Sequence, residues 1–212
     1  MRLLYTDRQV VVCVKPVGVS SEDCPGGMPE LLRRVCGGEI YTLHRLDLNV
    51  GGVMVYARTR ASASILSQAI QNGDLQKVYL AVVHGCPSPS EGILEDLLWK
   101  DSGKNKVFVV KRQRKGVKPA KLAYEVLEAG ERSLVKIRLF TGRSHQIRVQ
   151  FASRGWPLLG DHKYGSRDRE TAPALWSYQL TFPHPESHKT MEFSALPTGE
   201  VWERFHMKGK ET

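Results

Sequence analysis

The feature that most constrains this chain is an aspartate placed beside an apolar run. Asp47 ends the polar stretch Leu43–Asp47 and shortly precedes the apolar run Val53–Tyr56. An ionised carboxylate in such surroundings is costly unless a cation or hydrogen bonds compensate it. Arg148 ends a second polar stretch, Gly142–Arg148, on a segment that reads as an apolar-faced helix. We expect Arg148 to supply that cation, either in a structural ion pair or beside a catalytic carboxylate.

Length and composition are those of an ordinary globular protein. The 212 residues fit one domain, 1–212, with 41% hydrophobic and 25% charged residues. The sequence has neither the ~20-residue apolar run of a membrane helix nor a signal peptide at Met1–Asp7. The cysteines, Cys13, Cys24, Cys36 and Cys86, form no C-x-x-C pair, so neither a zinc site nor a disulfide framework is indicated. We expect a cytoplasmic protein with free thiols and no membrane contact.

The positive charge is concentrated in the second half of the chain. Residues 1–100 carry equal numbers of Lys/Arg and Asp/Glu, so the whole net charge of +9 falls in residues 101–212. Within that half, the basic segment Lys104–Lys121 holds eight Lys and Arg residues and no acid. Such a run favours a nucleic-acid partner over a merely solvated hairpin.

Hydrophobic periodicity and turn residues predict mixed secondary structure. The predicted strands are 3–5, 10–14, 53–58, 77–83, 122–127 and 134–140, the last two forming a hairpin around Gly130-Glu131. One helix is expected between Pro29 and Gly37-Gly38, and another from a Thr59 cap to Asn72-Gly73. A third helix should begin at a Ser144 cap, pass through Ile147 and Phe151, and end at Gly155 and Pro157.

Hairpin-joined strands with a few helices between them predict the fold class. We expect an α+β protein: one domain with a central, largely antiparallel mixed sheet flanked by helices and loops.

Several motifs then occur in a recognisable order. They are Asp7–Gly18, His44–Asp47, Lys77–Ala81, Gly142–Arg148, Gly160–Gly165 and the late stretch Ala174–Pro185. Together these motifs resemble the RluA-type pseudouridine synthases, which isomerise uridine in ribosomal or transfer RNA. The resemblance covers about residues 5–185 and implies a pseudouridine-synthase-like catalytic domain without the S4 RNA-binding module that many relatives carry.

The resemblance implies a chemistry and three catalytic residues. The reaction exchanges an N1–C1′ bond for a C5–C1′ bond, with no redox change and no group donor, so no cofactor and no metal are expected. The family's indispensable aspartate maps onto Asp47, its active-site tyrosine onto Tyr79, and the arginine that pairs with the aspartate onto Arg148. Asp47 could attack C1′, attack the base or abstract a sugar proton, and each route needs an ionised carboxylate. Tyr79 could stack on the flipped uracil or accept the C5 proton.

The remaining candidate residues concern RNA binding. Arg45 resembles the family residue that fills the gap left by the flipped nucleotide or touches its phosphate. For His44 and His145 we prefer hydrogen-bonding support over a metal or general-base role, because neither has a second ligand at useful spacing. The predicted substrate-binding residues are Arg45, His44, Arg143, His145, Gln146, Lys111, Arg112, Arg114 and Lys115. RNA, ribosomal or transfer, is the expected partner of a monomer that needs no other protein.

Two departures from the family pattern and two alternatives stand beside this reading. Val50-Gly51-Gly52 replaces the usual Thr-Ser-Gly, which removes two hydroxyls from the catalytic loop, and Gln150 stands where a His is common. One alternative is a catalytically silent RNA-binding protein of the same fold, which retention of Asp47, Tyr79 and Arg148 argues against. Another is a glycoside or nucleoside hydrolase that uses Asp47 and releases free base. That chemistry usually uses two carboxylates across the bond that breaks, and no second acid lies in a recognised motif of this sequence.

Overall fold

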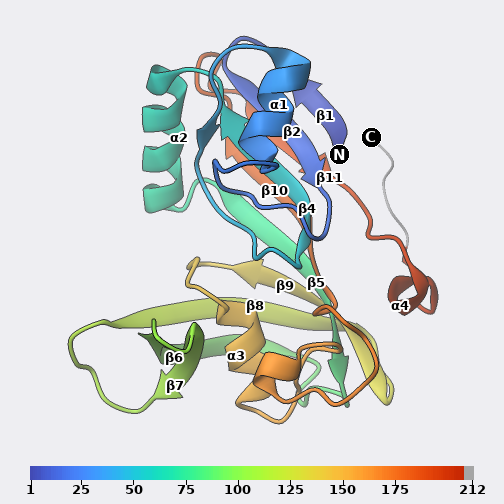
Figure 1. The fold of residues 1–212 in the computed structure, drawn as a ribbon. Coiled ribbons are helices and arrows are strands. Elements are labelled where there is room, and N and C mark those ends of the chain that lie inside the picture. The colour runs from blue at the N-terminus through green and yellow to red at the C-terminus, as the bar shows by residue number, and fades with distance from the viewer. Residues whose placement is uncertain (208–212) are drawn as a thin grey trace. The chain divides into compact units, whose positions relative to one another are not determined.

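The computed structural model describes residues 1–207, which form two compact units (Figure 1). Unit 1 contains Met1–Lys77 and Trp176–Thr198, and unit 2 contains Val78–Leu175 and Gly199–Phe205. The chain passes from unit 1 to unit 2 within strand β5 (Gln76–His84). None of the helices in residues 1–207 is long and apolar enough to cross a membrane.

Unit 1 is a mixed sheet with helices. Its elements are β1 (Arg2–Thr6), β2 (Val10–Lys15), α1 (Met28–Cys36), β3 (Tyr41–Thr42), β4 (Gly51–Ala57), α2 (Arg60–Asn72), β10 (Leu175–Pro183) and β11 (Thr190–Ser194). The strand order is β1-β2-β4-β10, with β3 pairing to β4 and β11 to β10. The β1–β2, β2–β4 and β10–β11 pairs are antiparallel, whereas β10 runs parallel to β4.

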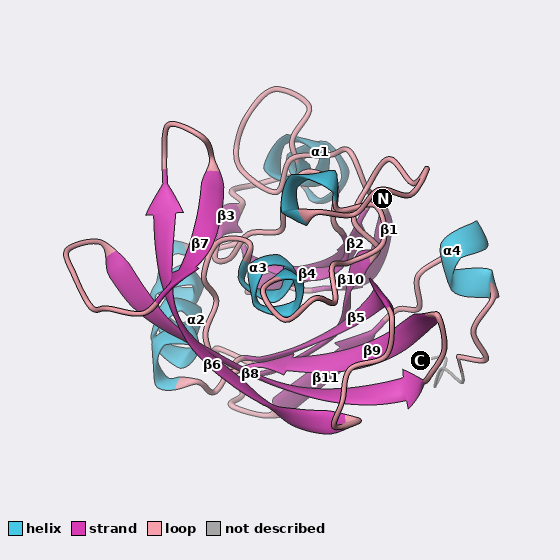
Figure 2. Cartoon of the chain, turned by 90° about the horizontal axis from the view of Figure 1, so that it is seen from below, coloured by secondary structure: helices cyan, strands magenta, loops and turns pink. Residues whose placement is uncertain are grey.

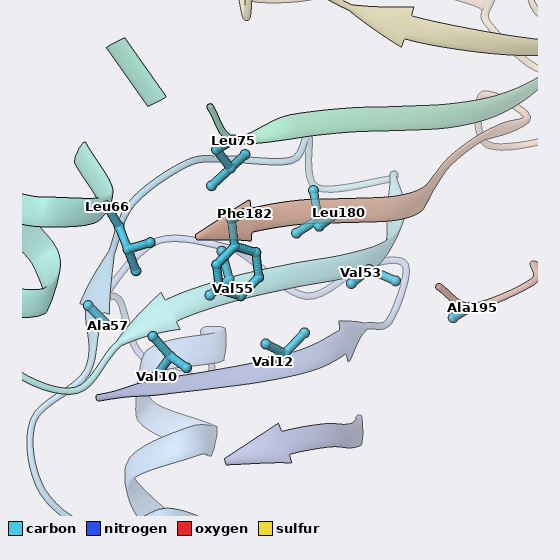
Figure 3. Packing of buried hydrophobic residues seen from close by; sticks show 10 residues of the cluster. All are labelled: Val10, Val12, Val53, Val55, Ala57, Leu66, Leu75, Leu180, Phe182 and Ala195. Carbon is cyan, nitrogen blue, oxygen red and sulfur yellow. The ribbon is translucent and has the colours of Figure 1, made fainter. Parts of the chain in front are cut away.

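The core of unit 1 lies between this sheet and α2. Val10, Val55 and Phe182 pack against Leu66 of α2 in a cluster of fully buried side chains (Figure 3). All seven residues of β4 are buried, so this strand is covered on both faces. That burial explains why residues 53–57 of this strand form a continuous apolar run rather than an alternating one. The Asp47 loop leads directly into this rigid strand.

The predicted helix boundaries of unit 1 are confirmed. Pro29 lies in the first turn of α1, and Gly37 follows its last residue with a positive φ of 65°. The Thr59 hydroxyl accepts a hydrogen bond from Ser62 N at 3.0 Å, and Gly73 ends α2 in the left-handed region with φ 84°.

Unit 2 is an antiparallel sheet with one covered face. Its elements after β5 are β6 (Glu91–Asp101), β7 (Lys106–Val110), β8 (Val117–Glu128), β9 (Arg132–Leu139), α3 (Gln146–Ala152), the 3₁₀ turn η1 (His162–Tyr164) and α4 (Glu200–Glu203). The strand order is β5-β9-β8-β6-β7. Helix α3 lies against this sheet (Figure 2). Its Val149 packs in one buried cluster with Leu98, Val107 and Ala120. The predicted β8–β9 hairpin and the α+β fold class are confirmed.

The start of the third helix was predicted wrongly. The helix begins after His145, whose backbone is left-handed with φ 50°, and Ser144 makes no capping bond. Instead, the side chain of Gln146 holds the entry to the helix, because its Oε1 accepts hydrogen bonds from Arg143 N at 3.0 Å and Thr141 Oγ1 at 2.8 Å. The helix ends at Ala152, before the predicted Gly155.

Candidate active site

The backbone around Asp47 is fixed on both sides. Ser21 Oγ accepts a hydrogen bond from Leu46 N at 3.2 Å and donates one to Leu46 O at 3.0 Å. After the aspartate, Val50 N donates to Asp47 O at 3.0 Å and closes a turn. The Asp47 side chain itself is half-buried. The loop therefore presents this carboxylate from a backbone that has little freedom to move.

A buried lysine, Lys15, ties the same loop to β2. Its ammonium is fully buried and donates to Pro16 O at 2.9 Å, Val19 O at 2.7 Å and Leu48 O at 3.2 Å. Burial lowers the pKa of Lys15 to about 8, and the negative charge of Asp47 opposes that shift. Lys15 therefore interacts electrostatically with Asp47 and, through its hydrogen bond to Leu48 O, restrains the residue after Asp47.

Sequence reasoning missed the role of Lys15, although a signal was present. The strand before it, Val10–Val14, is continuously apolar, which is the pattern of a fully buried strand. A lysine that continues such a strand directly before Pro16 must satisfy its ammonium on nearby carbonyls.

Strand β10 explains the glycine at position 51, where the family usually has a hydroxyl residue, and the neighbouring Gly52. A Cβ at Gly51 would collide with the ring of Trp176 and lie 3.0 Å from Lys15 O. At Gly52, where φ is 120°, a Cβ would meet the backbone of Ser177. Trp176 and Ser177 are the parallel register partners of these two glycines. The indole therefore occupies the space that any larger side chain at position 51 would need.

His44 and Arg45 lie in the same loop but in opposite environments. His44 is 7% exposed, and its Nε2 accepts a hydrogen bond from Val55 N at 3.4 Å. Burial, helped by the charge of Lys77, holds the pKa of His44 well below its usual value, so the ring is neutral. Arg45 is exposed, and its Nη1 pairs with Glu22 Oε1 at 3.0 Å. Of the two, Arg45 has the exposure that contact with RNA requires.

In unit 2, Arg148 forms a buried bidentate ion pair with Asp161. Arg148 Nε donates to Asp161 Oδ2 at 2.7 Å, and Nη2 donates to Asp161 Oδ1 at 2.8 Å. The Arg148 side chain is 10% exposed and that of Asp161 is 1% exposed. Sequence reasoning missed Asp161, although it lies in the Gly160–Gly165 motif. The sequence feature that could have indicated Asp161 is a carboxylate that closely follows the apolar pair Leu158-Leu159.

Tyr164, from the same loop, completes the surroundings of Arg148. The guanidinium carbon lies 5.2 Å from the centre of the Tyr164 ring. The Tyr164 hydroxyl accepts from Val107 N at 2.8 Å and lies 2.8 Å from His145 Nδ1. His145 is thereby fixed by a hydrogen bond at the entry to α3. The loop that carries Asp161 and Tyr164 thus positions Arg148 and His145 of the second motif.

The loop that carries Asp161 and Tyr164 is itself anchored by Asp168. The Asp168 carboxylate accepts hydrogen bonds from Gly160 N at 2.9 Å and Glu170 N at 2.9 Å, and lies 2.8 Å from His84 Nε2. Burial opposes ionisation, but these bonds together with one from Ser166 outweigh it and lower the pKa of Asp168. This carboxylate stays ionised and serves as a structural anchor.

The other predicted residues of unit 2 fall into two groups. Tyr79 lies in β5 and is 6% exposed. Gln146 is buried, and its Nε2 donates to Lys121 O at 3.1 Å, while Arg143 Nε donates to Pro119 O at 2.9 Å. The contacts of Gln146 and Arg143 hold the motif loop on β8. The basic residues Lys111, Arg112, Arg114 and Lys115 all lie in the exposed turn between β7 and β8.

These placements assign the predicted residues to separate units. Asp47, His44 and Arg45 belong to unit 1, whereas Tyr79, Arg148 and the basic turn belong to unit 2. The pairing of Asp47 with Arg148 therefore stays a prediction. Within residues 1–207, no group of three or more His, Cys, Asp or Glu side chains could hold a metal ion.

Comparison with known proteins identifies the class of enzyme. The sequence pattern of the RNA pseudouridylate synthase family matches residues 9–153, more than half of the chain and a range that includes Asp47, Tyr79 and Arg148. The chain belongs to this family of isomerases that act on RNA, and it is a pseudouridine synthase of the RluA type.

Individual relatives place the chain within that family. It is 35% identical to the dual-specificity RNA pseudouridine synthase RluA of Escherichia coli strain K12, with 91% of each chain covered. It is 32% identical to the ribosomal large subunit pseudouridine synthase D of Neisseria meningitidis, over 94% of this chain and 59% of the relative. The solved structure of human RNA pseudouridylate synthase domain containing 4 shares the fold, with a TM-score of 0.78 at 24% identity over 92% of this chain and 88% of that one.

Proposed function

We propose that this protein converts a specific uridine in ribosomal or transfer RNA to pseudouridine, with Asp47 as the catalytic carboxylate. The observation that carries the proposal is the Asp47 turn. Its backbone is clamped by Ser21 before the aspartate and by Lys15 after it, so a half-buried carboxylate is presented in a fixed place. A catalytic group needs such restraint because small displacements of the reacting atoms cost large factors in rate.

The reaction asks little of the protein beyond positioning and an ionised carboxylate. The N1–C1′ bond breaks, the uracil turns within the pocket, and C5 bonds to C1′. C5 then loses its proton and N1 gains one, so substrate and product are isomers and no cofactor is consumed. Attack on C1′, attack on the base and abstraction of a sugar proton all use Asp47 as an anion.

Tyr79 and Arg148 complete the proposed catalytic group. Arg148 would pair with Asp47, since an adjacent cation favours the charged form of a carboxylate. The buried contact with Asp161 supports this role, because it fixes the plane of the guanidinium before RNA arrives. The Tyr79 ring would stack on the flipped uracil, and its hydroxyl is the candidate acceptor for the C5 proton.

RNA recognition is proposed to come from exposed cations. Arg45 would enter the gap that the flipped nucleotide leaves, exchanging its contact with Glu22 for RNA. The turn Lys111–Lys115 would follow the phosphate backbone. The protein is proposed to act as a cytoplasmic monomer without another protein.

The decisive experiment is Asp47→Asn. The amide has the shape of the acid but is neither a nucleophile nor a base, so pseudouridine formation should disappear while RNA affinity and thermal unfolding stay near wild type. Asp74→Asn, an exposed aspartate of the same unit, is the matched control. Nucleosides from treated transcripts are measured by chromatography and mass spectrometry.

Three outcomes separate the alternatives. Asp47→Asn turnover within about tenfold of wild type, well short of the loss seen when a nucleophile is removed, would contradict the assigned role. Release of free uracil by the wild type would identify a hydrolase, and binding without any product would identify a silent RNA-binding protein. Pseudouridine maps of total RNA from cells with and without the gene would identify the target.

A further inference from the structure

The hairpin end of the unit 2 sheet has an aromatic outer face. Trp99 of β6 and Phe108 of β7 are direct register partners, and Val117 of β8 is the partner of Trp99 on the other side. The neighbouring residues Leu98 and Val107 pack under α3. Because successive side chains on a strand point to opposite faces, Trp99 and Phe108 lie on the face turned away from α3.

The two rings form a partly exposed pair. Their centroids are 6.1 Å apart and their planes are inclined by 31°. Val117 beside them is buried, whereas both rings keep part of their surface in solvent. Farther along the same face of β6, Ile93 is 58% exposed and Glu95 is exposed as well. Aromatic rings on an open sheet face are the usual arrangement for stacking on nucleobases.

Cations surround the aromatic pair. The Arg114 guanidinium lies 5.0 Å from the centre of the Trp99 ring. Lys106 Nζ lies at the edge of the sheet, 5.8 Å from the centre of the Phe108 ring and 5.4 Å from that of Tyr164. Both cations belong to the acid-free segment Lys104–Lys121, whose remaining basic residues are mostly exposed. The nearby acid is Asp101, whose Oδ1 accepts a hydrogen bond from Lys104 N at 3.1 Å. The charge around the rings is therefore complementary to a polyanion.

We propose that this aromatic patch, Trp99 and Phe108 with Arg114 and Lys106, is a stacking site for unpaired bases of RNA. One base would lie on the Trp99 ring with the Arg114 guanidinium against it, and the next would lie on Phe108, while lysines contact the intervening phosphate. The site lies on the face of the unit 2 sheet opposite α3, the helix that carries Arg148, so it would bind nucleotides other than any that contacts Arg148. The inference rests on the proposed function in that it takes RNA as the ligand.

The test uses an RNA that cannot react. A short oligocytidylate contains no uridine and no stable duplex, so its binding reports the patch independently of catalysis. Affinity is measured by fluorescence anisotropy for wild type, Trp99→Leu, Phe108→Leu and Trp99→Phe. Ile93→Ala, on the same face of β6, is the control, and thermal unfolding verifies that each variant is folded.

We expect affinity for oligocytidylate to fall when an aromatic ring of the patch is removed. Trp99→Leu and Phe108→Leu should each weaken binding by about tenfold, whereas Trp99→Phe and Ile93→Ala should stay within about threefold. The dependence of affinity on salt should not change, because no phosphate contact is removed. Binding should also quench tryptophan emission in the wild type and not in Trp99→Phe, a readout that remains valid even if Trp99→Leu fails to fold.

Affinity of both leucine variants within about twofold of wild type, less than the loss of one stacked base, would overturn the stacking site. An equal loss in Trp99→Phe would do the same, since phenylalanine still stacks. If the wild type binds oligocytidylate through the patch but makes no pseudouridine, the proposed function fails and the stacking site stands. If it makes pseudouridine but these variants bind normally, only the stacking site fails.

Discussion

The Arg148 guanidinium and the Asp161 carboxylate meet edge to edge, with Nε 2.7 Å from Oδ2 and Nη2 2.8 Å from Oδ1. Such a bidentate contact fixes the plane of the guanidinium as well as its position. It also balances the arginine's charge inside unit 2. Arg148 is therefore oriented by its own unit and does not depend on the substrate for its geometry.

Asp161→Asn should lower both stability and turnover. The amide offers one acceptor in place of two and removes the carboxylate charge beside buried Arg148, and breaking a buried ion pair in this way typically costs about 3–5 kcal/mol of unfolding free energy. We expect kcat to fall while KM for RNA changes little, because under the proposed mechanism Asp161 would act through Arg148 on the chemistry. Chemical denaturation and steady-state kinetics measure the two effects.

A second variant separates packing from positioning at this pair. Asp161→Asn combined with Arg148→Met replaces the ion pair with groups that need no counter-charge, so stability should recover while activity should not. Recovery of activity together with stability would show that the pair serves only the fold.

Lys15 predicts a pH dependence of stability. Its pKa is about 8 in the folded protein against 10.5 for an ordinary lysine, because burial disfavours the ammonium. Between these values the unfolded chain binds more protons than the folded one, so this group makes the unfolding free energy rise as pH increases from about 8 to 10.5. Urea unfolding across that range should show a steeper rise in the wild type than in Lys15→Met, because the variant keeps Lys77, whose pKa burial also lowers to about 8. A parallel pH dependence in both proteins would assign it to other groups.

Lys15→Met should also loosen the loop around Asp47. The variant removes the ammonium that donates to the carbonyls of Pro16 and Val19, at about 1–3 kcal/mol for each buried acceptor left unpaired, whereas Leu48 O keeps the hydrogen bond from Gly18 N at 2.9 Å. Hydrogen exchange at the amides of residues 46–50 should become faster, while exchange in α2 stays unchanged.

Substitutions at Tyr79 separate the ring from the hydroxyl. If the ring stacks on uracil, Tyr79→Phe should keep tight RNA binding, and any loss of rate then reports the hydroxyl. Tyr79→Ala should lose binding as well, including about 1–3 kcal/mol of stacking. Equal single-turnover rates in all three proteins would place Tyr79 outside the site.

The basic turn Lys111–Lys115 should affect the salt dependence of RNA binding but not the maximal rate of the reaction. Replacing Lys111, Arg112, Arg114 and Lys115 with Gln should weaken RNA binding and flatten the slope of log affinity against log salt by up to about three or four units, at roughly 0.7–0.9 per phosphate contact. The maximal rate at saturating RNA should change little, as expected for loss of uniform binding. Arg8→Gln with Arg60→Gln removes exposed cations of unit 1 and is the control. An unchanged slope in the fourfold variant would remove the turn from the RNA-binding surface.

The fold was predictable from sequence where local signals decide it. The Thr59 cap, Gly73 and Pro29 each act on the turn in which they stand, and α1 and α2 have the predicted limits. Strand β6 was not predicted, because its outer face carries Glu95 and exposed Ile93, and pairing with β7 and β8 rather than propensity holds it. The Ser144 cap was wrong because Gln146, already inside the helix, bonds the preceding backbone.

The site was predictable only where a motif marks it. Asp47 and Arg148 stand out as charges in apolar surroundings, so sequence alone singles them out. Lys15 and Asp161 take their meaning from partners that lie 33 and 13 residues away. Such contacts depend on how the chain folds back, which no local pattern records.

The close approach of the Trp176 indole to Gly51 predicts that positions 51 and 176, which lie far apart in the sequence, change together during evolution. A hydroxyl-bearing side chain at 51 would collide with the ring, so Gly51→Ser should be tolerated only when position 176 also becomes smaller. Gly51→Ser and Trp176→Ala should each lower the unfolding midpoint, and the double variant should recover part of the loss. Relatives with the usual hydroxyl residue at 51 are then expected to carry a small side chain at 176, so the two sites change together or not at all.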